Sequence, residues 1–112
     1  MNKTEKIKLF KQAIEQWGVH PQIRMVFEEC SELMNALAKT YRNRVTKQDV
    51  ITELADVVIM CEQMAVVFGQ EEYEAELERK LEKMKKKLEN PKCNLLNQEN
   101  NFEKVLENGN NH

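Results

Sequence analysis

Apolar residues recur at steps of three and four along most of this chain, and no stretch alternates apolar and polar residues as a half-buried strand does. This pattern predicts an all-α fold. The expected helices cover about residues 3–17, 21–43, 47–68 and 71–89. Gly18 and Gly69 suit the ends of the first and third helices, and Thr46 is a good N-cap for the third. Short connections favour a four-helix bundle with antiparallel neighbours.

The third of these segments is apolar almost all round. Between positions 54 and 68 its only polar residues are Asp56, Glu62 and Gln63. A helix of this kind is expected to be buried. It carries more apolar surface than three neighbouring helices in a chain of 112 residues can readily cover. We therefore expect a homodimer or a homotetramer in which the subunits share part of this surface.

The composition changes after the pair Asn90-Pro91. Seven of the last twenty-one residues are asparagine, and few apolar residues remain to be buried. We expect one helical domain over residues 1–89, followed by an Asn-rich C-terminal tail over residues 90–112. Such a tail is either mobile or a short docking arm.

Charge and composition argue against several classes of function. Seventeen basic and nineteen acidic residues give a formal net charge of −2, which provides no general attraction for nucleic acid or for an anionic membrane. No segment reads as a signal peptide or a membrane span, so we expect a cytoplasmic protein. Cys30 and Cys61 lie in apolar segments, and the two histidines form no cluster with cysteine, so neither a disulfide framework nor a zinc site is indicated.

Two acidic couplets carry the most informative chemistry. Glu29-x-x-Glu32 and Glu53-x-x-Asp56 each have helical i,i+3 spacing inside an apolar segment. Burying an unpaired carboxylate costs free energy, and converging carboxylates repel one another unless a hard cation lies among them. A short loop would make the second and third helices antiparallel neighbours, so that the couplets face each other. The pattern therefore predicts a divalent cation site inside a helical bundle.

The residue types also indicate which cation is expected. Oxygen-only ligands favour magnesium, with manganese as a possible substitute, over zinc, copper or iron. Neither couplet contains the histidine that a di-iron bundle would use. Magnesium usually binds together with substrate phosphates, which makes a nucleotide polyphosphate the expected substrate.

These residues resemble the MazG-like nucleotide pyrophosphohydrolases, a group within the all-α nucleoside triphosphate pyrophosphohydrolase superfamily. The resemblance covers about residues 10–85 and rests on three motifs: Trp17-Gly18-x-x-x-Gln22, Glu28-Glu29-Cys30-Ser31-Glu32-Leu33 and Glu53-Leu54-Ala55-Asp56-Val57-Val58-Ile59-Met60. It implies a hydrolase that converts a nucleoside or deoxynucleoside triphosphate into the monophosphate and pyrophosphate, for control of the nucleotide pool or removal of unwanted nucleotides. It also implies magnesium ligands at Glu29, Glu32, Glu53 and Asp56, typically within a dimer or tetramer.

Positive charge is needed where pyrophosphate leaves. Lys39 is favoured because it is in helical phase with Glu32, and Lys80 because the resemblance places a lysine of the fourth helix near the site. A solvated face is the expected role of the remaining basic candidates, which are Arg42, Arg44, Arg79 and Lys83.

Some further residues are candidates for catalysis or base recognition. Glu28 shares an arc of its helix with Glu32, and either carboxylate would orient the attacking water. Trp17 is expected in the core, with stacking on a base as the alternative. His20 and Gln22 are candidates for reading the edge of the base.

Two other functions stay open at the level of sequence. Phosphoribosyl-ATP pyrophosphohydrolases resemble the same superfamily and would use the same chemistry on a different substrate. A non-catalytic helical dimerisation module would instead pair the acids with Lys39 and with the loop that holds Arg42 and Arg44. Four acids against one well-phased lysine leave the charges of such a module unbalanced.

Overall fold

The protein folds into four α-helices within residues 1–90, the part of the chain that this computed structural model describes. They are α1 (Lys3–Trp17), α2 (Val19–Thr40), α3 (Lys47–Phe68) and α4 (Gln70–Glu89). These residues contain no strand. The predicted all-α architecture is confirmed. The predicted tail lies outside the described residues, apart from Asn90.

Local capping chemistry sets the bounds of α3, which agree with the prediction. The Asp49 N–H donates to the Thr46 hydroxyl oxygen at 3.1 Å, and the Thr46 N–H donates to the Asp49 carboxylate at 3.0 Å. This reciprocal capping box satisfies backbone donors at the start of the helix. At its end Gly69 adopts a φ of 145°, a conformation that side chains with a Cβ rarely take.

The C-terminus of α2 differs from the prediction, because the helix ends at Thr40 and not at residue 43. Asn43 takes the left-handed conformation with a φ of 53°. The Asn43 N–H donates to the Thr40 carbonyl at 3.2 Å, and the Arg44 N–H donates to the Lys39 carbonyl, also at 3.2 Å. These two bonds form a Schellman motif, which ends the helix and turns the chain back toward its last turn.

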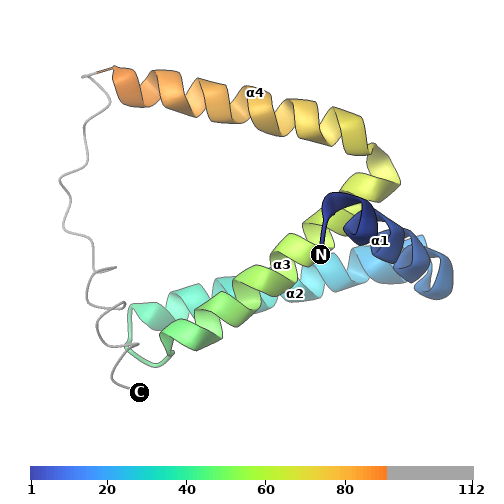
Figure 1. The fold of residues 1–112 in the computed structure, drawn as a ribbon. Helices are drawn as coiled ribbons and strands as arrows, with labels where there is room; N and C mark the ends of the chain where they lie inside the picture. Colours follow the sequence, from blue (N-terminus) through green and yellow to red (C-terminus); the bar gives the residue numbers. More distant parts are fainter. Residues whose placement is uncertain (91–112) are drawn as a thin grey trace.

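The antiparallel pair α2 and α3 makes the most extensive contact between elements, and α1 packs on both (Figure 1). The buried apolar side chains are Phe10, Ala36, Met60 and Ala65. An ion pair between Lys3 and Glu74 joins α1 to the first half of α4. Figure 1 shows the rest of α4 leading away from α2 and α3. The acids of the two couplets therefore lie on the pair of helices with the most extensive contact.

Much apolar surface remains exposed in the single chain. The expected burial of α3 holds for Met60 and Ala65, whereas Val58 is 52% exposed, because only one side of α3 is covered by α1 and α2. The apolar seam of α4 is likewise open to solvent; it comprises Tyr73, Leu77, Leu81, Met84 and Leu88. Within residues 1–90 no helix is both long and apolar enough to cross a membrane.

Candidate metal centre

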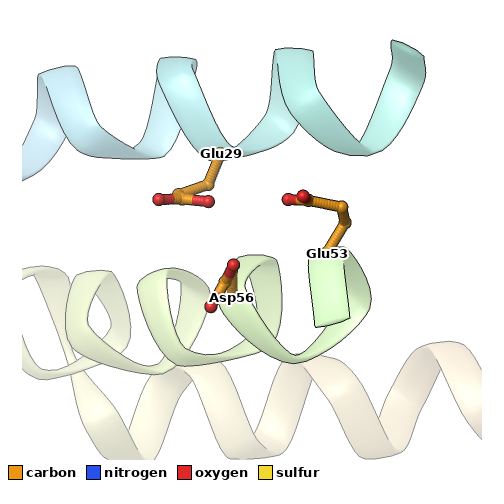
Figure 2. Close-up of side chains that lie close together, drawn as sticks. All are labelled: Glu29, Glu53 and Asp56. Atoms are coloured by element: carbon orange, nitrogen blue, oxygen red, sulfur yellow. The ribbon is translucent and has the colours of Figure 1, made fainter. Parts of the chain in front are cut away.

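Three carboxylates meet in the gap between α2 and α3 (Figure 2). Glu29 extends from α2, while Glu53 and Asp56 extend from α3, and one oxygen of each lies within 4.8 Å of the others. The i,i+3 spacing places Glu53 and Asp56 on one face of α3. The antiparallel packing turns that face toward Glu29. The structure thus brings together three of the four predicted ligands in one cluster.

Residues 1–90 provide this cluster with no ion-pair partner. All three residues are half-buried. One carboxylate oxygen of Glu29 and one of Glu53 are enclosed and accept no hydrogen bond. None of the ion pairs within residues 1–90 involves these acids. Enclosed acceptors without donors are uncommon in folded proteins, and here they face one another.

The surroundings raise the pKa values of Glu29 and Glu53 above their usual value of 4.5. Loss of hydration is the largest cause for both carboxyls. Repulsion from Glu32 and Asp56 follows, together with a hydrogen bond shared with Glu32. Glu32, the fourth predicted ligand, therefore lies beside the cluster even though it is not one of the three residues that meet most closely.

This donor set fits a hard divalent cation. All of the available ligand atoms are carboxylate oxygens, the type that magnesium and manganese prefer. A cation would supply the partner that the enclosed oxygens lack and would offset the repulsion that raises the two pKa values. Cys30 and Cys61 are free thiols.

An open cavity of about 330 Å³ adjoins the carboxylates at the end of α2. Glu32 and Glu53 line one part of it, and Lys39 and Arg44 line another. The position of Lys39 agrees with its predicted phase on the helix. Arg44 was expected on a solvated face and is exposed, and the Schellman motif also brings it to this open cavity. Asn43, which precedes Arg44, was the sequence signal that could have predicted this turn, because asparagine often takes the left-handed position in such motifs.

Several other candidate residues lie away from this cavity. Glu28 is exposed and does not join the cluster. Lys80 is exposed on α4, where its ammonium nitrogen lies 3.9 Å from a carboxylate oxygen of Glu76. Neither residue lines the cavity, so a single chain does not bring them to the carboxylates.

The candidates for base recognition are also separate from the cavity. Trp17 is 56% exposed, which contradicts the expectation that it lies in the core. It is the last residue of α1, where the chain turns at Gly18 into α2. His20 is exposed, whereas Gln22 is buried and presents little surface to a ligand.

Comparisons with protein-family models, with curated proteins and with solved structures give no match for this chain. The resemblance to the MazG-like pyrophosphohydrolases therefore stays an expectation based on motifs. The physical support for a metal centre comes from the converging carboxylates and from the cavity beside them.

Proposed function

We propose that this protein hydrolyses a nucleoside or deoxynucleoside triphosphate to the monophosphate and pyrophosphate, with magnesium as cofactor and manganese as a substitute. One observation carries the proposal: carboxylate oxygens of Glu29, Glu53 and Asp56 lie within 4.8 Å of one another, and no cationic side chain among the described residues is paired to them. The cavity beside them offers space for phosphates, and its lining includes two cationic side chains, Lys39 and Arg44, as well as the acids Glu32, Asp49 and Glu53.

The carboxylates would hold the cation, and Glu32 would complete the set from its position beside Glu29 and Glu53. Bound magnesium would reduce the negative charge of the triphosphate and make a water molecule more acidic. Because the ligands come from two packed helices, their positions are preorganised before the substrate binds.

The reaction requires no covalent bond between the protein and the substrate. The oxygen of a water molecule forms a bond to the α-phosphorus while the bond to the bridging oxygen breaks, and pyrophosphate leaves in line. Glu32 is better placed than Glu28 to orient this water and accept its proton, because Glu32 lines the cavity and Glu28 does not. The products are the nucleoside monophosphate and pyrophosphate.

The non-catalytic dimerisation module has less support. That alternative requires the acids to be paired with Lys39 or with the loop that holds Arg44. No such ion pair exists in the described part of the chain. A phosphoribosyl-ATP pyrophosphohydrolase would use the same carboxylates, and a panel of substrates decides between the two enzymes.

We further propose that the protein acts as a homodimer or homotetramer in the cytoplasm, where nucleoside triphosphates are made and used. Large apolar side chains on α2 and α3 lie open to solvent in the single chain, with Phe27 69%, Met34 70% and Phe68 76% exposed. Large apolar side chains that are exposed in this number commonly mark a protein interface. Association would cover it and would exclude water from the neighbouring carboxylates.

Phosphorus NMR of the products tests the proposed function. The protein is incubated with the ordinary and deoxy nucleoside triphosphates and with phosphoribosyl-ATP, in ¹⁸O-labelled water, with magnesium or with chelator. We expect pyrophosphate and monophosphate only in the presence of the cation, with the label in the monophosphate. Orthophosphate as the first product would mean attack at the γ-phosphorus and would overturn the proposal. Label in pyrophosphate would overturn the assignment of the α-phosphorus.

A further inference from the structure

Two cationic residues are held next to each other at one end of the acidic site. The Arg44 N–H donates to the Lys39 carbonyl at 3.2 Å, across the left-handed residue Asn43. This backbone bond joins the loop to the last turn of α2 and fixes the backbones of the two residues next to each other. Both residues line the cavity that also contains Glu32 and Glu53.

The helix geometry directs Lys39 toward the acids. Lys39 follows Glu32 by seven residues, which is two turns and about 10 Å along the helix axis. Side chains of an α-helix lean toward its N-terminus, and from Lys39 that is the direction of Glu32. Lys39 lines the cavity, and its charge contributes to lowering the pKa of Asp49, after the hydrogen bonds from Thr46.

Neither cation is committed to another group. Lys39 and Arg44 form no ion pair within residues 1–90. Asp49 lines the same cavity, but its carboxylate already accepts the Thr46 N–H at 3.0 Å in the capping box. The two positive charges therefore lack a full partner, as the carboxylates do on the other side of the cavity.

We propose, on the basis of the proposed function, that Lys39 and Arg44 bind the diphosphate part of the substrate. The triphosphate then runs from the carboxylates, which take the α-phosphate with the cation, toward the loop between α2 and α3. Arg44 supplies a planar fork that matches two phosphate oxygens, and Lys39 supplies a compact charge. The open cavity of about 330 Å³ lets pyrophosphate leave at this end.

Arg44 lines the cavity, whereas its basic neighbours in the sequence do not. Arg42 belongs to the same loop and is exposed, yet it does not line the cavity. Lys47 begins α3 and does not line it either. Arg42 and Lys47 are therefore matched controls, because each carries the same charge within a few residues of the proposed site.

The test is calorimetric titration of the full chain with inorganic pyrophosphate in excess magnesium. We expect Arg44→Gln and Lys39→Gln each to weaken pyrophosphate binding by at least about tenfold, the scale of a lost charge-assisted hydrogen bond. Arg42→Gln and Lys47→Gln should stay within about twofold of the parent, which is well inside the effect of one such bond. Arg44→Lys should fall between parent and Arg44→Gln, because it keeps the charge and loses the fork. Thermal melting monitors the folding of each variant.

A second titration, with nucleoside monophosphate and magnesium, separates this site from the metal centre. Monophosphate affinity should be unchanged in Arg44→Gln, because that ligand has no diphosphate. Equal losses for Arg42→Gln and Arg44→Gln would overturn the proposal, since a general charge effect would explain both. A parent that binds no pyrophosphate would also overturn it. If binding depends on Lys39 and Arg44 but no triphosphate is hydrolysed, the diphosphate site stands and the proposed function falls.

Discussion

Glu29 and Glu53 extend into one gap from facing helices, and each has an enclosed carboxylate oxygen that accepts no hydrogen bond. Folding stability alone does not favour this arrangement, because it combines loss of hydration with repulsion. Proteins commonly accept such a local cost where a ligand later removes it. The pair is therefore the strongest structural indication that a cation belongs between α2 and α3.

Removing single charges from the cluster should abolish most of the activity. We expect Asp56→Asn and Glu32→Gln each to lower the rate of pyrophosphate release by at least about a hundredfold, the scale seen when a preorganised electrostatic group is lost. Glu62→Gln is the matched control, because this acid lies on α3 and lines a separate cavity near α1 and α4. It should retain nearly the parent rate in a continuous pyrophosphate assay.

The same variants should fold. Without metal, Asp56→Asn should melt at or above the temperature of the metal-free parent, because repulsion with Glu29 and Glu53 is relieved. Calorimetric melting in chelator measures this. A clear loss of stability combined with normal activity would instead favour a structural salt-bridge role for Asp56.

Acidification should stabilise the metal-free protein. The pKa values of Glu29 and Glu53 are raised in the folded state. At a pH between 4.5 and these raised values, the folded state therefore binds more protons than the unfolded chain. The free energy of unfolding therefore increases as the pH falls through that window. The pKa of Asp49 is lowered from its usual value of 3.8, so protonation of Asp49 decreases the free energy of unfolding, but only when the pH falls below about that value.

Melting in chelator between about pH 7.5 and about pH 5 measures this linkage. Tm should rise as the pH falls, and Glu53→Gln should reduce the rise. Saturating magnesium should raise Tm at neutral pH and remove most of the dependence of Tm on pH, because the cation favours the charged carboxylates. A Tm that falls steadily over this range in the metal-free parent would contradict the raised pKa values.

Substitution of Asn43 should show how much the left-handed backbone conformation at this position affects the free energy of unfolding. Asn43→Val places a β-branched side chain at a φ of 53° and should lower the free energy of unfolding by about 1–2 kcal/mol. Asn43→Gly accepts this conformation and should stay within about 1 kcal/mol of the parent. Urea denaturation measures both. The valine variant should also bind pyrophosphate more weakly, because the turn positions Arg44 next to Lys39.

Light scattering at micromolar concentration should give a mass of two or four chains, where one chain is 13.2 kDa. Val58→Glu should shift the mass toward one chain, because it places a charge on the exposed apolar face of α3. Thr52→Glu provides the control, because Thr52 is exposed and polar on the same helix. A fully active monomer would show that one chain builds the whole site and that the exposed face has another role.

Local rules predicted the fold and the acidic cluster, because both depend on short-range patterns. Thr46 and Gly69 delimit α3, and i,i+3 spacing orients Glu53 and Asp56. The cavity at Arg44 was not predicted, because it depends on the direction in which a left-handed turn sends the chain. Trp17 was misplaced because helical phase does not reveal where a helix ends relative to its neighbours. The positions of Arg44 and Trp17 can be predicted only when the tertiary arrangement of the helices is known.

The carboxylates lie in the middle of the α2–α3 pair and not at its ends, which has a consequence for motion. In most helical pairs the terminal turns open first, and the central amides exchange with solvent slowly. Here the repulsion acts between central turns, at the most extensive contact in the molecule. Amides around Glu29 and Asp56 should therefore exchange faster in the metal-free protein than their central position suggests. Free magnesium would thus regulate the local opening of the same two helices that hold the protein together.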